Sequence, residues 1–418
     1  MYDLNLSAEQ IEFRDTVKDF VKNEVTPAAL LPARLEPFEK PLMTDLLGYV
    51  SRMGLRTLSL SEAAGGAGAD TLTSCIVLEE LAAGDVDLAM ALGLTQGLAR
   101  GLFEDAMTAE QRGRLLPDFL EDHDYHLAFV PHAAGAGRGW HYHRASEDEG
   151  GAEATAVRQS NGEWIVNGTI AFVPNAPIAK LFVVQARTDA KKTGRNGIST
   201  LVIPRGTAGL TVTDPTGETD GAGASLTTRW YHGTGAEVRF ENCRVPAESL
   251  VGKEGQSPLA ADVHEQRSVI QIAAINLGLG RGAYDAAVDY AKIRVQGGRP
   301  IIQHQAIGTI LADSAIKLEL ARNAIWKAAW AADHAEGSSA SLPGLPLHTL
   351  ARVYTAEAVH EVTLGAAECF GAMGVMRDMP LQKYVHDAHV FLYGADHDSA
   401  TKLEIAESLA GFERSKAA

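Results

Sequence analysis

Residues 153–174 read EATAVRQSNGEWIVNGTIAFVP, and they decide the fold class because apolar and polar residues alternate here, between flanking segments that are helical in pattern. The two alternating runs meet at Asn161-Gly162, a dipeptide typical of a β-hairpin turn. Further short runs rich in β-branched residues follow as far as Pro246, separated by Gly and Asp turns. This spacing predicts a middle domain over residues 126–253 that is an antiparallel β-sandwich or barrel.

The segment before this domain has a helical period. From Ser7 the sequence LSAEQIEFRDTVKDFVKNEV predicts an amphipathic helix, with Ser7 and Gln10 as a capping box. Similar patterns, bounded by Gly, Thr or Pro, continue to about residue 121. We therefore predict an N-terminal all-α domain over residues 1–125.

The segment after the β domain returns to helix. Residues 261–295 predict one helix of roughly 50 Å if it is continuous, ending before a GGRP turn. Two more long helices are predicted at about residues 301–335 and 348–369. Long helices joined by short turns are typical of an antiparallel bundle, so residues 254–418 are predicted to form a four-helix bundle and the whole chain an α+β protein.

Composition excludes several classes of function. The chain has 418 residues and a formal net charge of -16, which disfavours nucleic acid as a partner. No apolar run is long enough for a membrane span, and the N-terminus has no secretory signal, so a cytoplasmic location is expected. Three widely spaced cysteines predict buried thiols and no disulfide: Cys75, Cys243 and Cys369.

Three local patterns are weak candidates for sites. One pattern resembles a dinucleotide-binding loop and consists of Gly278, Gly280 and Gly282. No strand precedes these glycines, and the helical period favours a role in close contact with a neighbouring helix. The small residues of 131–139 could expose backbone N–H groups to a ligand or form a plain interdomain loop. The histidines of segment 386–397 match no standard ligand spacing, so no metal is predicted.

The α-β-α order and several segments of the second half resemble the acyl-CoA dehydrogenase family of flavoproteins. The most specific segment is YAKIRVQGGRPIIQHQAIGTILADSAIKLELARNAIWKAAW at 290–330, joined by GEWIVNGTIAFVPNA, AECFGAMGV and YVHDAHV. The resemblance implies an oxidoreductase with FAD as cofactor and an acyl-CoA or related thioester as substrate. It also implies a homo-oligomer, a dimer or a homotetramer, with electron-transfer flavoprotein or oxygen as electron acceptor.

The resemblance also assigns residues to the cofactor, which would lie between the β domain, the bundle and a second subunit. One group would contact the flavin and the thioester: Val130, Pro131, Gly135, Gly137, Phe172, Val173 and Pro174. Another would hold the remainder of FAD: Arg294, Gln296, His304, Gln305, Glu368, Phe370, Gly371 and Ala372. Arg138 and Arg267 would contact substrate.

The catalytic base is the main departure from the family pattern. Many members carry it as Glu in a Tyr-Glu-Gly-Thr loop, which here is YGADHDSA at 393–400, and the family Glu falls on Gly394 or Ala395. Asp396 is a neighbouring carboxylate and one candidate base. Other members place the base on the bundle helix just before an Arg, where this chain has Gln266 and, one residue earlier, Glu265 as the second candidate.

Other departures leave alternatives open. Phe172-Val173-Pro174 replaces a Trp-Ile-Thr flavin contact, and Gly297 replaces an aromatic residue. The first reading is α,β-dehydrogenation of a CoA thioester with hydride transfer to flavin. The alternatives are the same fold with desulfinase-like or lyase-like chemistry, an oxygen-dependent oxidase or monooxygenase, and a non-catalytic subunit of a hetero-oligomer.

Overall fold

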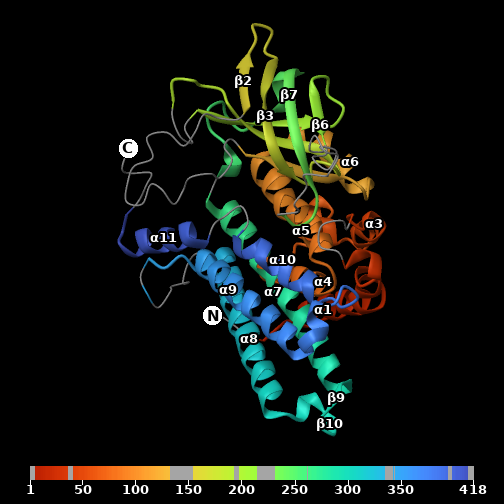
Figure 1. The fold of residues 1–418 in the computed structure, drawn as a ribbon. Helices are drawn as coiled ribbons and strands as arrows, with labels where there is room; N and C mark the ends of the chain where they lie inside the picture. Colours follow the sequence, from red (N-terminus) through yellow and green to blue (C-terminus); the bar gives the residue numbers. More distant parts are fainter. Residues whose placement is uncertain are drawn as a thin grey trace, which may run out of the picture.

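The structure is a computed structural model that describes residues 5–35, 41–131, 154–192, 197–213, 231–260, 262–334, 342, 344–393 and 398–412. Its elements follow the order helices, strands, helices, so the predicted fold class is confirmed. Figure 1 shows the strands at one end of the molecule and the bundle helices running away from them. Within the described residues, no helix combines the length and the apolar character that crossing a membrane requires.

The N-terminal helices are α1 (Ala8–Phe20), α2 (Thr26–Ala29), α3 (Thr44–Arg52), α4 (Thr71–Gly84), α5 (Val86–Arg100) and α6 (Ala109–Glu121). The predicted capping box is present at the start of α1, where the Gln10 N–H donates to Ser7 Oγ and the Ser7 N–H donates to Gln10 Oε1. Helices α4 and α5 are almost completely buried, because α4 packs against α1, α5, α7 and α8, and α5 packs between β1 and α7. They therefore form the centre of the molecule.

The middle sheet contains β1 (His126–Val130), β2 (Ala154–Arg158), β3 (Trp164–Pro174), β4 (Ala179–Arg187), β5 (Ile198–Pro204), β6 (Leu210–Thr213), β7 (Gly235–Val245) and β8 (Leu250–Val251). The strand order is β6-β7-β3-β2-β4-β5-β8, with β1 paired to β4. Strands β2 and β3 form the predicted hairpin around Gly162, whose φ of 90° suits glycine.

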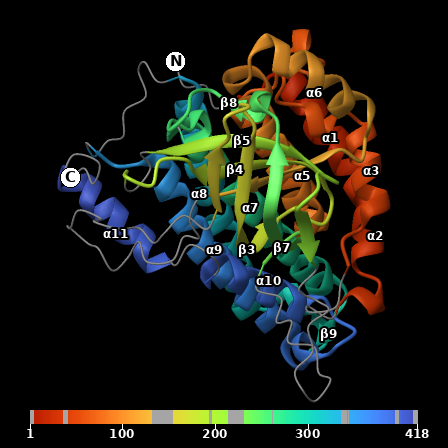
Figure 2. The same cartoon turned by 90° about the horizontal axis from the view of Figure 1, so that it is seen from above.

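The sheet differs from the antiparallel expectation in two pairings. Strand β1 lies parallel to β4 over its whole length, and β2 meets β4 in parallel at Thr155 and Arg187. Strand β1 follows directly from α6 and is far from β4 along the chain, so no hairpin forces the two to run in opposite directions. Figure 2 shows the sheet from above, with α5 and α6 beside it.

The C-terminal bundle contains α7 (Asp262–Ile293), α8 (Gln305–Asp333), α9 (Leu347–Phe370) and α10 (Leu381–Tyr393), followed by α11 (Asp398–Leu409). A two-residue hairpin of β9 (Val295–Gln296) and β10 (Arg299–Pro300) connects α7 to α8. Helix α7 contacts α8, α9, α10 and also α4 and α5 of the first domain. It is therefore the common element of the two helical domains.

The glycines of α7 permit close contact with α4. A Cβ atom added at Gly278 would lie 2.3 Å from the carbonyl oxygen of Glu79, and one at Gly282 would lie 2.6 Å from that of Ala83. Both distances are far shorter than real Cβ contacts. The expected role of these glycines in helix packing is thus confirmed.

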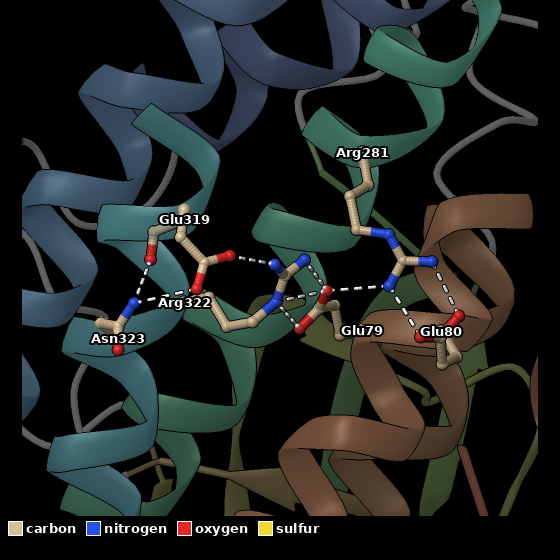
Figure 3. Close-up of polar contacts among 6 residues, drawn as sticks. All are labelled: Glu79, Glu80, Arg281, Glu319, Arg322 and Asn323. Carbon is tan, nitrogen blue, oxygen red and sulfur yellow. Dashed lines mark hydrogen bonds and ion pairs between the residues drawn. The ribbon is translucent and has the colours of Figure 1, made fainter. Parts of the chain in front are cut away.

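A buried ion network connects the same helices (Figure 3). Glu79 of α4 accepts hydrogen bonds from Arg281 of α7 at 2.8 Å and from Arg322 of α8 at 2.7 Å. Glu80 binds the other side of the Arg281 guanidinium, and exposed Glu319 binds Arg322. Burial alone would raise the pKa of Glu79, but the two guanidinium groups hold it below its usual value. Glu79 is therefore a carboxylate in the folded protein.

Candidate active site

The edge of the sheet that faces the first domain is held by Thr95 of α5. Thr95 Oγ1 lies 3.1 Å from His126 Nδ1 and accepts from the Leu127 N–H at 3.3 Å, both at the start of β1. Asn175, directly after β3, donates from Nδ2 to the Ala91 carbonyl oxygen at 2.8 Å. These contacts fix the strands that carry Val130 and Phe172–Pro174 against α5.

The predicted flavin contacts on β3 differ in exposure. Val173 is buried in the sheet core, whereas Phe172 and Pro174 are partly exposed. The Phe172 ring packs on Tyr231 with 4.4 Å between ring centroids. It also packs directly on Gly235, where a Cβ atom would lie 2.2 Å from the ring. Val130 is buried at the end of β1 and Pro131 follows it. Among the described residues of this set, Pro131, Phe172 and Pro174 are partly exposed and could be reached by a ligand.

The second predicted group lies around the β9-β10 hairpin. Arg294, Gln296 and Gln305 are exposed, and His304 donates from Nε2 to the Gln296 carbonyl oxygen at 3.0 Å. This hydrogen bond orients the hairpin against the residue that precedes α8. Helix α8 has no side-chain cap at its N-terminus, so its first N–H groups are available to other acceptors.

The segment Glu368–Ala372 belongs to the same end of the bundle. The Phe370 ring stacks on Tyr290 of α7 at 4.0 Å, only four residues before Arg294. Gly371 has a φ of 59°, and a Cβ atom added to it would meet nothing within 4 Å. Arg294, His304 and the segment after α9 are thus brought together.

The two groups of predicted cofactor residues are not brought together within one chain. Helix α7 has 32 residues and is therefore about 48 Å long. Tyr231, on which Phe172 packs, precedes His232, whose Nε2 donates to the Asp387 carbonyl oxygen of α10 at 3.0 Å. Tyr384 of the same helix lies beside Gly282, near the middle of α7, whereas the β9-β10 hairpin follows the last residue of α7 (Figure 1). One chain therefore places the two groups apart along α7.

The predicted catalytic residues are only partly described. Asp396, Gly135, Gly137 and Arg138 lie outside the described residues, and so does the side chain of Glu265, whose backbone belongs to the first turn of α7. Tyr393, the last residue of α10, leads directly to the Asp396 segment and is exposed.

Arg267 is described and is already paired. Its guanidinium donates to Asp333 Oδ1 at 2.9 Å, and Asp333 also accepts from the backbone N–H and the hydroxyl of Thr71. The Arg267 Nε group is buried and has no hydrogen-bond partner among the residues that the structure describes. Arg267 therefore connects α7, α8 and α4, and retains one unused donor.

Arg267 lines a cavity of about 100 Å³ between α4, α5 and α7, and the sequence reasoning missed most of its walls. Polar side chains contribute much of the lining: Ser59, Asp70, Thr71, Ser74, Gln96, Arg100, Asp105 and Gln271. A signal was present in the sequence, because Gln96 and Arg100 are four residues apart in an otherwise apolar helix and share one face.

The bundle end is suited to the phosphate groups of FAD. Arg294 and Arg299 are exposed guanidinium groups, which bind phosphate through several N–H donors, and the uncapped N-terminus of the 29-residue helix α8 favours negative charge. The aromatic ring of Phe172 at the sheet end provides a surface for a flat ring system. The donor chemistry of both groups thus fits the cofactor.

Comparisons with known proteins agree with these features. The N-terminal, middle and C-terminal domain models of acyl-CoA dehydrogenase match residues 7–123, 144–231 and 265–409. The chain is 30% identical to a probable acyl-CoA dehydrogenase of Bacillus subtilis, over 97% of this chain and 99% of that protein. It is also 30% identical to a short-chain specific acyl-CoA dehydrogenase of Clostridium acetobutylicum, over 93% and 94% of the two chains.

A solved structure is similar over the same extent. The butyryl-CoA dehydrogenase of Megasphaera elsdenii superposes with a TM-score of 0.81, covering 98% of this chain and 100% of that one at 25% identity. The similarity therefore includes all three domains and their arrangement.

Proposed function

The chain belongs to the acyl-CoA dehydrogenase family, and from this premise we propose that it dehydrogenates the CoA thioester of an acyl group between the α and β carbons. The observation that carries the proposal is the 30% identity over 97% of the chain, together with the matching three-domain fold. FAD is the cofactor of the reaction, and when bound it supplies the acceptor for the β hydride.

The chain itself must supply a base for the α proton. A carboxylate within hydrogen-bond reach of that proton, in a site dry enough to raise its pKa towards neutrality, would serve. We propose Asp396 for this role, with Glu265 as the second candidate. Asp396 is favoured because it follows α10 closely, at the position of the family's catalytic loop.

We further propose that each FAD is shared by two chains. The sheet end of one chain would hold the flavin, through Phe172, Pro174 and the segment after Val130. The bundle end of the other would hold the phosphates and the adenosine, through Arg294, His304, Gln305 and the segment Glu368–Ala372. The separation of these groups along α7, one beside its middle and one beyond its last residue, supports a homo-oligomer, either a dimer or a tetramer.

The remaining assignments are also proposals. Electron-transfer flavoprotein or oxygen would reoxidise the cofactor. A cytoplasmic location is supported by Cys75, Cys243 and Cys369, which are all free and buried, as is usual in a reducing compartment.

The test is an anaerobic titration of the FAD-loaded protein with acyl-CoA thioesters. The absorbance of oxidised flavin should fall on addition of a substrate, since no other electron donor is present. In the same assay Asp396→Asn should slow the loss of absorbance by roughly two to four orders of magnitude, because that is the usual cost of removing a general base.

The control for this assay is Asp378→Asn, the same substitution in the segment between α9 and α10. It should leave the rate unchanged. A normal rate in Asp396→Asn with a slow rate in Glu265→Gln would transfer the role to Glu265. A flavin that no thioester reduces would contradict the proposed reaction.

A further inference from the structure

The cavity between α4, α5 and α7 is small and polar. Its volume of about 100 Å³ is room for roughly three water molecules. Gln96 forms part of its wall, is fully buried, and donates from Nε2 to the Leu55 carbonyl oxygen at 3.1 Å. Gln96 Oε1 is buried and accepts no hydrogen bond from the described part of the chain. A buried acceptor of this kind is costly unless something in the cavity donates to it.

Gln271 of α7 is a second polar group in this wall. The residue is 6% exposed. A Cβ atom added at Gly97 would lie 2.6 Å from Gln271 Oε1, so only glycine at position 97 leaves space for this side chain. Within the described chain Gln271 forms no hydrogen bond. Ser74, also buried, adds a hydroxyl to the lining. A hydrocarbon tail in this cavity would leave all these groups without partners.

Arg100 is the charged group of the cavity that lacks a counter-ion. It is partly buried and makes no hydrogen bond or ion pair with any residue that the structure describes. The other charges are already compensated or hydrated. Asp333 neutralises Arg267, Asp70 caps α4 by accepting from the Thr73 N–H, and Asp105 is exposed. A guanidinium group in such a place is suited to an oxygen acceptor on a ligand.

A short series of contacts relates the cavity wall to the strand end that the proposed function places beside the thioester. Val130, at the end of β1, pairs with Val184 of β4, and the next residue, Gln185, donates to Ser257 Oγ at 3.0 Å. Pro258, adjacent to Ser257, forms part of the cavity wall. An acyl chain that extends from the end of β1 past Ser257 and Pro258 would run towards the cavity that Arg100 and Gln271 line.

We propose that this cavity binds the distal end of the acyl group, and that the substrate is the CoA thioester of a short acyl chain ending in an oxygen-bearing group, a carboxylate or a hydroxyl. This inference rests on the proposed function and adds the substrate class. Arg100 and Gln271 are the residues that would select this class over a plain hydrocarbon chain.

The test measures binding to the FAD-loaded protein after chemical reduction of the flavin, so that no turnover occurs. Calorimetry would compare three thioesters of equal chain length: glutaryl-CoA, ω-hydroxypentanoyl-CoA and pentanoyl-CoA. At least one of the first two should bind about 10- to 100-fold more tightly than pentanoyl-CoA, the usual effect of hydrogen bonds to a charged group. Their order distinguishes a carboxylate from a hydroxyl.

Two variants identify the residues responsible. Arg100→Met should remove most of the preference for the oxygen-bearing chains, whereas Gln271→Leu should strengthen pentanoyl-CoA binding. Arg112→Met is the matched control, since Arg112 of α6 is partly buried but outside the cavity lining. It should change none of the three affinities.

The outcomes separate the two proposals. Equal or tighter binding of pentanoyl-CoA by the unmodified protein would overturn the substrate class and leave dehydrogenation of a thioester intact. A preference for an oxygen-bearing chain that survives in both Arg100→Met and Gln271→Leu would also overturn it. Binding of none of the three thioesters would overturn the proposed function and this inference together.

Discussion

Thr95 illustrates how one side chain can position a functional strand. It lies on a helix that is otherwise mostly apolar, and its hydroxyl contacts His126, the Leu127 N–H and Asn175 at 3.1, 3.3 and 3.4 Å. Sequence alone indicates that a buried polar residue in such a helix needs partners. It does not indicate which ones, because these partners are 31 to 80 residues away along the chain.

The buried His126 predicts a loss of stability in acid. Burial, and the nearby Arg56, lower the pKa of His126 to about 3, whereas a histidine in an unfolded chain titrates near pH 6.5. Between these values the unfolded chain binds more protons, so the free energy of unfolding falls as the pH falls. At pH 5, protonation of His126 in the unfolded chain lowers the free energy of unfolding by about 2 kcal/mol.

The measurement is urea unfolding at pH 7 and pH 5. His126→Asn should have a lower free energy of unfolding than the unmodified protein at pH 7. Between pH 7 and pH 5, however, its free energy of unfolding should fall by about 2 kcal/mol less than that of the unmodified protein. His123→Asn, which removes an exposed histidine three residues earlier, is the control and should not change the loss. An equal loss in His126→Asn would show that His126 is not the titrating group.

At the scale of elements, the ion network of Glu79, Arg281 and Arg322 stabilises the packing of α4 on α7 and α8. Its side chains are largely buried, at 5%, 17% and 22% exposed. Removing the central carboxylate leaves two guanidinium groups in a site of low dielectric. We expect Glu79→Gln to lower the free energy of unfolding by about 3–5 kcal/mol, the usual cost of breaking a buried pair.

The same network contains its own control. Glu319 also binds Arg322, at 2.7 Å, but its side chain is 63% exposed. Glu319→Gln should therefore cost less than about 1 kcal/mol in the same denaturation experiment. Similar effects of the two substitutions would contradict the importance of burial at Glu79.

Most elements were predictable because their signals are local. The capping box of Ser7 and Gln10 and the Asn161-Gly162 hairpin act within a few residues, and both are present as expected. The glycines of α7 contact the distant helix α4, but their four-residue spacing is a local signal. The parallel pairing of β1 with β4 was missed, since strand direction depends on a connection that pattern alone does not trace. The Glu79 network was missed for the same reason, because its partners are 202 and 243 residues away.

At the scale of the whole molecule, the resemblance predicts a set of candidate site residues but not their arrangement. It assigns Phe172, Arg294 and His304 to the cofactor, which stays a prediction, and only the structure shows how they are separated along α7. The cavity around Gln96 and Arg100 was missed because its walls come from three helices and the segment before α7. Such sites depend on packing, which the sequence does not display directly.

The separation of the two groups predicts that a cofactor site can be rebuilt from two defective chains. Arg294→Met damages the bundle end, and Phe172→Asp damages the sheet end, so an oligomer of either variant alone should retain little FAD. In a mixed oligomer, the intact sheet end of the first variant would meet the intact bundle end of the second. One complete site should therefore return.

The most direct test of the account is the flavin absorbance of such mixed oligomers, with the two variants co-expressed under different tags and purified through both tags. We predict that the mixed sample binds FAD and is bleached by a thioester substrate without oxygen, whereas each variant alone is nearly colourless. A mixed sample as colourless as the separate variants, next to a yellow unmodified protein, would contradict a site shared between two chains.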